Sequence, residues 1–329
     1  MRKLSFEIIV LLSTFIISII LGIIIIPILK KLKVGQIERD DGPASHLKKQ
    51  GTPTMGGIII IIAMIISSII AYIYMNMVGL EDTARKIIPM MLLTIGFGAI
   101  GFIDDYKKLV LKNTEGLKPA YKMLGLLIVS VGFSLYLTEV MHFEPQIYIP
   151  FADVYFTFPV WLYVPFVVLV FLATTNAINL TDGIDGLSTS VTTIILTCLT
   201  IISVIFGIKE VTVFGSILIG TCLGFLLFNL YPAKVMMGDT GSLLLGGAIA
   251  GIAIYLKMPL LLLIIALVPI LETLSVIIQV AYFKKTGNRI FKMAPLHHHF
   301  ELSGWKENKI VSVFSIVTLI CCALGLMVI

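Results

Sequence analysis

The sequence contains few charged residues and few cysteines. Charged residues make up 13% of its 329 residues, whereas a soluble globular domain carries about 25%. The four cysteines lie in apolar runs without metal-ligand spacing, so neither a disulfide framework nor a cysteine metal site is expected. No internal repeat, linker or low-complexity segment divides the chain. These absences exclude a soluble enzyme and a disulfide-rich scaffold, and they predict one integral membrane domain over residues 1–329.

Long apolar runs make up most of the chain. Hydrophobic residues account for 58% of the sequence, and the mean hydropathy is +1.05. A helix needs about 20 apolar residues to cross a bilayer, and ten runs are long enough: 5–29, 56–75, 86–103, 122–140, 159–179, 187–207, 211–230, 241–256, 258–283 and 307–329. The run at 258–283 is overlong and contains Pro269 and Glu272, so a kink or break is expected there. The sequence therefore predicts an all-α polytopic membrane protein, with a small β-hairpin in the loop near 143–158.

The basic residues are distributed unevenly between the loops. The loops after the first, third, fifth, seventh and ninth predicted helices hold 18 of the 24 lysines and arginines. Because basic loops stay on the cytoplasmic side, these loops are predicted to be cytoplasmic and both termini to lie outside. Arg2 and Lys3 oppose this orientation weakly.

The unusual polar residues gather on the predicted cytoplasmic face. Asn176, Asn179, Asp182 and Asp185 lie within ten residues, directly after an uncharged helix. Four other polar stretches end at the same face: Lys48 to Gly57, Asp104 to Lys108, Asn229 with Met236 to Ser242, and Ala294 to Glu301. Polar side chains are costly in a membrane segment, so this convergence favours a functional site.

Each stretch also has a simpler explanation. Asp104 and Asp105 followed by lysines are also consistent with a solvated helix end, and Lys49 with the positive-inside rule alone. The segment from Met236 to Ser242 is also consistent with a turn that caps the next helix. A single histidine in the 297–299 stretch would be an ordinary loop residue, but three in a row near five acids are harder to explain that way.

Together the polar residues predict phosphoryl chemistry. Five carboxylates on one face resist ionising together unless a cation compensates them, and these are Asp104, Asp105, Asp182, Asp185 and Asp239. Oxygen ligands of this kind suit Mg²⁺ or Mn²⁺, usually through one or two carboxylates and the substrate phosphates. The nearby lysines and histidines suit the charge of a diphosphate. The expected reaction is metal-assisted phosphoryl transfer between a water-soluble diphosphate and a membrane lipid.

The same motifs carry a family resemblance that covers essentially the whole chain. They are the Asp104-Asp105 pair with Lys108, Asn176 to Gly186, Met237 to Asp239, and Pro295 to Phe300. The chain resembles the polyprenyl-phosphate N-acetylhexosamine-1-phosphate transferase superfamily. The triple histidine and the segment from Thr52 to Gly57 favour its phospho-N-acetylmuramoyl-pentapeptide transferase branch, which makes lipid I for peptidoglycan.

The resemblance implies a reaction and a place for it. Undecaprenyl phosphate attacks the β-phosphate of UDP-N-acetylmuramoyl-pentapeptide, with Mg²⁺ as cofactor, and UMP leaves. The enzyme is expected in the bacterial plasma membrane, with its site on the cytoplasmic face. A homodimer is expected from the resemblance alone. Neither a covalent phospho-sugar intermediate nor a single displacement is favoured by the sequence.

The resemblance also implies residue roles. Asp239 is expected to bind the metal, and Asp104 and Asp105 to activate or orient the lipid phosphate with Lys108 as counter-charge. The expected uridine contacts are Lys49, Thr54, Asp182, Gly183 and Asp185. The expected lining of the diphosphate and sugar path is Asn179, Asn229, His297 and His298, with His297 and His298 also assigned to catalysis. Asn176, Met236 and His299 are expected to bind substrate.

Two positions stand apart. Met236 occupies a place where relatives often carry an aromatic residue that stacks on uracil, and a thioether packs on a base less selectively than a ring does. Glu272 lies inside a predicted span, where it either makes a structural hydrogen bond or shapes a lipid groove.

Three other functions are alternatives to this transfer reaction. A GlcNAc-1-phosphate transferase would use the same lipid and differ in the donor. A cation-coupled transporter would place polar residues near the bilayer midplane, often in an inverted repeat. A prenyltransferase would carry two aspartate-rich motifs and would leave the histidines unexplained.

Overall fold

The computed structural model describes residues 5–32, 51–109 and 116–329. Ten helices in these residues are long and apolar enough to cross a membrane. They are α1 (Phe6–Lys31), α2 (Gly57–Met77), α3 (Glu81–Leu109), α4 (Pro119–Leu135, continued by the π-helical turn Tyr136–Val140), α5 (Val160–Thr181), α6 (Leu187–Ile205), α7 (Lys209–Asn229), α8 (Gly238–Tyr255), α10 (Leu267–Thr286) and α12 (Glu307–Met327). The ten spans predicted from hydropathy are therefore confirmed.

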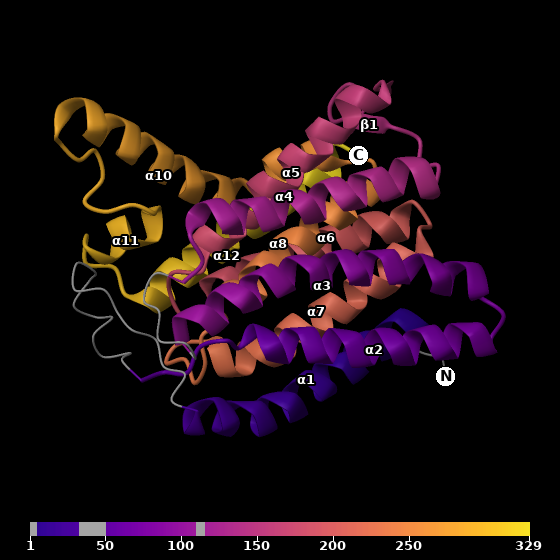
Figure 1. The fold of residues 1–329 in the computed structure, drawn as a ribbon, viewed down its shortest axis with the longest axis horizontal. Helices are drawn as coiled ribbons and strands as arrows, with labels where there is room; N and C mark the ends of the chain where they lie inside the picture. The colour runs from indigo at the N-terminus through magenta and orange to yellow at the C-terminus, as the bar shows by residue number, and fades with distance from the viewer. Residues whose placement is uncertain (1–4, 33–50, 110–115) are drawn as a thin grey trace.

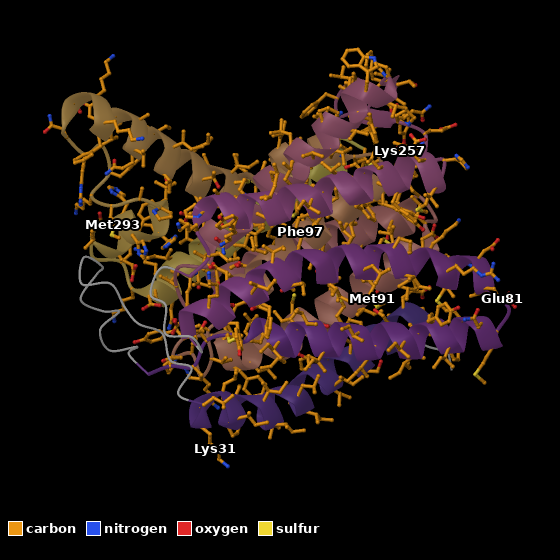
Figure 2. All side chains as sticks on the ribbon, viewed as in Figure 1. Lys31, Glu81, Met91, Phe97, Lys257 and Met293 are labelled. Carbon is orange, nitrogen blue, oxygen red and sulfur yellow. The ribbon has the colours of Figure 1, made fainter. Side chains whose placement is uncertain are left out.

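The long helices lie side by side, so the connecting loops gather at two ends of the bundle (Figure 1). Lys31 and Met293 mark one end, and Glu81 and Lys257 mark the other (Figure 2). We call these the Lys31 end and the Lys257 end. Phe6 stacks on Tyr74 near the start of α3, and the carbonyl of Val328 accepts a hydrogen bond from Tyr148 in the hairpin. Both ends of the described chain therefore lie at the Lys257 end.

The predicted break in the ninth apolar run is confirmed. A 3₁₀ turn (Pro259–Leu261) and the short helix α9 (Leu262–Ile265) precede α10, and Ala266 between them has non-helical backbone angles. Pro269 in the first turn of α10 has no N–H to donate to Ile265, which is consistent with a helix that restarts after the break. Beyond this point α10 diverges from the bundle (Figure 1).

The predicted β-hairpin is also present. Strand β1 (Gln146–Ile149) pairs antiparallel with β2 (Val154–Thr157), and Tyr148 lies opposite Tyr155. The N–H of Tyr148 donates to the carbonyl of Lys257, which fixes the hairpin to the turn after α8.

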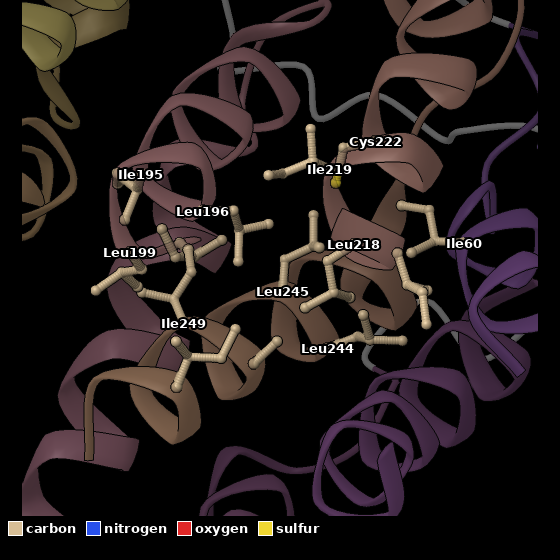
Figure 3. Packing of buried hydrophobic residues seen from close by; sticks show 14 of the residues in the cluster. Ile60, Ile195, Leu196, Leu199, Leu218, Ile219, Cys222, Leu244, Leu245 and Ile249 are labelled. Atoms are coloured by element: carbon tan, nitrogen blue, oxygen red, sulfur yellow. The ribbon is translucent and has the colours of Figure 1, made fainter. Parts of the chain in front are cut away.

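Helix α8 lies in the centre of the bundle. It packs against α3 and α5, and 83% of the residues in its candidate membrane span are buried inside the protein. Leucines and isoleucines of α6, α7 and α8 interdigitate around it, among them Leu196, Leu218 and Leu245 (Figure 3). Polar residues of a membrane helix normally face the protein interior rather than lipid, and α8, which is enclosed by protein, has a mean hydropathy of only 1.2. Its polar first turn is therefore held deep among other helices, at the Lys31 end.

Candidate active site

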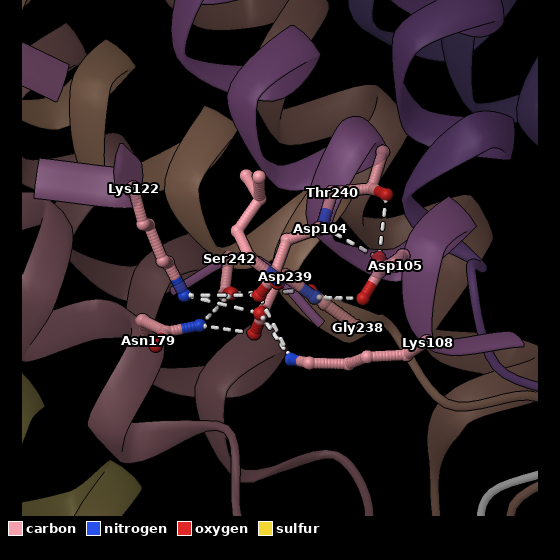
Figure 4. Close-up of polar contacts among 10 residues, drawn as sticks. Asp104, Asp105, Lys108, Lys122, Asn179, Gly238, Asp239, Thr240 and Ser242 are labelled. Carbon is pink, nitrogen blue, oxygen red and sulfur yellow. Dashed lines mark hydrogen bonds and ion pairs between the residues drawn. The ribbon is translucent and has the colours of Figure 1, made fainter. Parts of the chain in front are cut away.

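Asp239 in the first turn of α8 is the centre of a charged cluster (Figure 4). Its Oδ2 accepts from the Nζ of Lys108 at 2.8 Å and from the Nζ of Lys122 at 3.0 Å. Its Oδ1 accepts from the Nδ2 of Asn179 at 2.7 Å, and that amide also contacts the hydroxyl of Ser242 at 2.8 Å. Side chains from α3, α4, α5 and α8 therefore converge on one carboxylate.

Asp104 adds a second carboxylate to the cluster. Its Oδ2 lies 2.8 Å from the Nζ of Lys108 and 3.6 Å from that of Lys122, and its Oδ1 accepts from the N–H of Leu117 at 2.7 Å. Asp104 and Asp239 thus share two ammonium groups. Charge-assisted bonds of this kind are short and directional, so they fix where each charge lies.

Asp105 has different partners. Its Oδ1 accepts from the N–H of Asp239 at 3.2 Å, and its Oδ2 accepts from the N–H and hydroxyl of Thr240 at 2.9 and 2.6 Å. The first N–H groups of a helix lack intrahelical partners, and a carboxylate there is also favoured by the helix dipole. Asp105 therefore holds the start of α8 in place, and with it Asp239.

One face of α3 makes this arrangement possible. Gly101, Asp104, Asp105 and Lys108 are spaced three or four residues apart, so they lie on the same side of the helix. A Cβ on Gly101 would overlap the carbonyl oxygen of Asp239. The absence of a side chain lets α8 approach closely enough for the next turn of α3 to bind its first residues.

The turn between α5 and α6 carries the residues expected to contact uridine. Asp182 ends α5 and is half-buried. Burial raises the pKa of its carboxyl well above the ordinary value, and the carboxylates of Asp239 and Asp105 raise that pKa further. Asp185 is buried, and its Oδ2 accepts from the N–H of Ala233 at 2.9 Å.

Thr54 and Met236 lie on two segments that pair through their backbones. The N–H of Met236 donates to the carbonyl of Pro53 at 2.8 Å, and the N–H of Gly56 donates to the carbonyl of Met236 at 2.9 Å. Both side chains are buried, and Thr54 lies beside Gly238 at the start of α8. Lys49, the other predicted contact on this segment, lies outside the described residues.

Asn176 and Asn229 use their amides within the protein. The Nδ2 of Asn176 donates to the carbonyl of Leu172 at 2.7 Å. Asn229 is buried, accepts from the hydroxyl of Thr189 at 2.7 Å and donates to the carbonyl of Val235 at 3.0 Å. Asn229 therefore holds the loop that leads to α8.

The three histidines lie in α11 (Leu296–Glu301), and each Nδ1 has a different partner. That of His297 lies 3.2 Å from Glu272, that of His298 lies 2.8 Å from Glu301, and that of His299 accepts from the N–H of Lys292 at 3.1 Å. The ring of His297 packs against Gly183, so α11 contacts the α5–α6 turn.

Lys122 was not among the site residues predicted from the sequence. It lies in the first turn of α4, where its charge was counted only toward membrane orientation. In the sequence, Lys122 is recognisable only as a lysine that follows Pro119 at the start of an apolar run. This pattern does not distinguish a lysine exposed to solvent from one whose side chain turns toward the bundle.

The arrangement is compatible with a divalent metal that is held mainly by substrate. Among residues 5–32, 51–109 and 116–329, no three His, Cys, Asp or Glu side chains are placed to hold a metal ion by themselves. Mg²⁺ usually binds one or two protein carboxylates together with substrate phosphates. The hard oxygen donors of Asp239 and Ser242 suit that mode, and a metal on the Oδ2 of Asp239 would displace the two lysines that contact this oxygen here.

Comparisons with known proteins agree with this geometry. Residues 87–257 match the model of glycosyl transferase family 4, and residues 49–61 match signature 1 of phospho-N-acetylmuramoyl-pentapeptide-transferase. A protein of that name from Acetivibrio thermocellus is 50% identical over 325 residues, which cover 98% of this chain and 95% of the relative. The chain belongs to the phospho-N-acetylmuramoyl-pentapeptide-transferase family.

Other members of the family are as similar. The protein from Clostridium perfringens strain 13 is 52% identical and covers 94% of both chains, and that from Clostridium kluyveri is 48% identical and covers 99% of both. Family membership and ten candidate spans together identify a multi-pass membrane transferase. The resemblance drawn from the motifs is thereby confirmed.

Proposed function

We propose that this protein transfers phospho-N-acetylmuramoyl-pentapeptide from its UDP donor to undecaprenyl phosphate, giving lipid I and UMP. The observation that carries the proposal is the meeting of Asp104, Lys108, Lys122, Asn179 and Asp239 at one end of a membrane bundle. The phosphate of a membrane lipid lies at the bilayer surface, where a site at helix ends can reach it. The names of the relatives support this donor and this acceptor.

The charged cluster supplies the groups that phosphoryl transfer requires. Catalysis of this reaction consists mainly of positioning and of charge stabilisation. Lys108 and Lys122 hold the phosphate oxygens between Asp104 and Asp239, and Asp104 orients the attacking lipid phosphate. An oxygen of the lipid phosphate forms a bond to the β-phosphorus of the donor, while the bond between that phosphorus and the oxygen of the departing UMP breaks. Asp105 acts through α8, since both of its oxygens are bonded to that helix.

Mg²⁺ is proposed as cofactor, with Asp239 as its protein ligand. When bound, it offsets the charge of the donor diphosphate and of the departing UMP. Asn179 holds the Oδ1 of Asp239. A metal on Oδ2 would take the place of the ammonium groups of Lys108 and Lys122 that contact this oxygen here, and would leave them to bind phosphate oxygens.

The donor is proposed to lie between the α5–α6 turn and the paired segments at Thr54 and Met236. Asp182, Gly183 and Asp185 line one side of this region, Thr54 and Met236 line the other, and Lys49 is assigned there from the sequence. His297, His298 and His299 approach from α11. The basic Lys31 end is proposed to face the cytoplasm of a bacterial cell, and pairing of two chains remains a prediction.

The test is release of UMP by the purified protein in detergent. The assay contains undecaprenyl phosphate, UDP-N-acetylmuramoyl-pentapeptide and Mg²⁺, with Asp239→Asn measured in parallel. We expect release that depends on the lipid and on Mg²⁺ and that falls by about 10²–10³-fold in the variant, the size of a lost charge-stabilising group.

Two other outcomes have defined meanings. Release only with UDP-GlcNAc would assign the chain to the GlcNAc-1-phosphate branch. Release with neither donor, from protein with a cooperative thermal transition, would contradict the proposal and leave the transporter as the alternative.

A further inference from the structure

Glu272 is a buried acid in the apolar span α10 that the reaction described above does not use. Its side chain is fully buried, and both oxygens face a single residue. Oε1 accepts from the backbone N–H of His297 at 3.2 Å, and Oε2 lies 3.2 Å from its Nδ1. An acid at this depth is costly unless its partners are well placed. Here the partners are the backbone and the ring of one histidine.

This double contact fixes the ring of His297. A carboxylate at Glu272 would only accept hydrogen bonds, so Nδ1 of His297 would then carry the hydrogen. The bond to the backbone holds the first turn of α11 at the same time. His299 is held in the opposite sense, since its Nδ1 accepts an N–H. His297 and His299 would then be held in opposite tautomers by different partners, which is a recurrent way of orienting functional imidazoles.

The other nitrogen of His297 is directed at the donor side of the site. Nε2 is buried and has no hydrogen-bond partner among the described residues. A Cβ on Gly183 would overlap it, so the ring edge lies against the backbone between Asp182 and Asp185. The contacts run from α10 through Glu272 and His297 to the α5–α6 turn.

We propose that Glu272 is a positioning residue for the transfer reaction. It holds His297 with Nδ1 protonated and Nε2 toward Gly183, and thereby fixes the turn that receives the donor. The inference deepens the proposed function and rests on it for the role of that turn. It differs from a packing role for Glu272, because it depends on the direction of the hydrogen bond at Nδ1.

Glu272→Gln separates the two roles. The amide oxygen still accepts from the backbone N–H, but the NH₂ group now donates to Nδ1 and favours the opposite tautomer. We expect kcat to fall by about 10–100-fold, as for other partners that orient a functional histidine. The KM for undecaprenyl phosphate is expected to stay unchanged. Glu272→Asp, which keeps the carboxylate, should retain more activity than Glu272→Gln.

A double-mutant cycle with His297→Ala shows whether Glu272 acts through the ring. Glu272→Gln should have no further effect on kcat once His297 is alanine. The inference would be overturned if the losses of kcat in the two single variants multiplied in the double variant. It would also be overturned if Glu272→Gln alone kept the wild-type kcat.

Glu210 provides the matched control. It is a largely buried acid at the Lys257 end, where it accepts from the hydroxyl of Tyr255 at 3.0 Å. Glu210→Gln is expected to change thermal stability without lowering kcat. An equal loss of kcat in both variants would indicate a general cost of removing buried acids and would contradict a specific role for Glu272.

Nitrogen NMR of ¹⁵N-histidine-labelled protein gives a readout that does not need activity. His297 is assigned by difference from the His297→Ala spectrum, and its Nδ1 should be protonated in wild type and lose that state in Glu272→Gln. An unchanged ring signal would refute the positioning contact even if activity fell. Absence of UMP release by wild type with either donor would instead refute the proposed function, while the ring signal still reports on the contact.

Discussion

Asp104 and Asp105 are neighbours in the sequence but bind different partners. Asp104 contacts the lysines of the cluster, and Asp105 binds the first N–H groups of α8. We expect Asp105→Asn to destabilise the protein by about 1–3 kcal/mol, because its NH₂ group would face N–H donors. Asp104→Asn should lower UMP release with a smaller change in stability. Thermal unfolding in detergent and the UMP assay check the pair, and equal destabilisation by both would contradict the assignment.

Lys122 is the clearest addition that the structure makes to the site. We expect Lys122→Met to lower kcat by about 10²–10³-fold, since an ammonium that stabilises transferring phosphate is lost. Lys118→Met is the control, because Lys118 precedes the same helix and is exposed. Similar kcat values for the two variants would show that Lys122 serves only membrane orientation.

Asp182 gives a dependence of stability on pH. Burial and nearby carboxylates raise its pKa in the folded protein, so ionisation favours the unfolded state. The protonated carboxyl contributes to the free energy of unfolding. This contribution is fully present below about pH 4, where an unfolded aspartate titrates, and is lost as the pH rises through the raised pKa of the folded protein. Asp182→Asn should therefore match wild type in acid and become the more stable protein as the pH rises. A difference in midpoint temperature that does not vary with pH would contradict this.

At the scale of single residues, the sequence predicted which residues belong to the site better than it predicted which of them are in contact. Asp104, Lys108, Asn179 and Asp239 were predicted and do meet. Hydropathy and spacing, however, do not encode side-chain direction. They could not distinguish Asp105, which binds α8, from Asp104, or show that the amide of Asn229 is used within the protein.

At the scale of elements, the site depends on the close approach of α3 and α8. Gly101→Ala would place a methyl group against the backbone of Asp239. We expect a loss of about 1–3 kcal/mol in stability, typical of overpacking, together with reduced UMP release. Gly132→Ala on α4 is the matched control, because a Cβ there meets no atom within 4 Å. It should be neutral or slightly stabilising, because alanine favours a helix more than glycine does.

The elements themselves were largely predictable. Apolar length marks a span, and the proline with an acid in the ninth run marked the break before α10. The course of α10 away from the bundle (Figure 1) was not predictable, because composition and hydropathy do not give the direction that a helix takes after a break.

At the scale of the whole molecule, labelling of single cysteines tests the proposed orientation. The four native cysteines are buried, so a membrane-impermeant thiol reagent should give little background. We expect Ala152→Cys in the hairpin turn to react in intact cells, and Ser303→Cys near α11 to react only after permeabilisation. The reverse pattern would place the Lys31 end outside and contradict the proposed cytoplasmic site.

The central position of α8 has a consequence for how the protein is made. Its first residues are Gly-Asp-Thr-Gly-Ser, and its hydropathy is the lowest among the ten candidate spans. On its own such a segment enters lipid poorly, since an acid within a span is costly. Its partners α3 and α5 precede it in the chain, so they are already synthesised when α8 leaves the ribosome. Helix α8 is thus synthesised after the helices that it depends on for insertion. Substitutions that weaken α3 should therefore reduce the amount of α8 that integrates into the membrane as well as the activity of the protein.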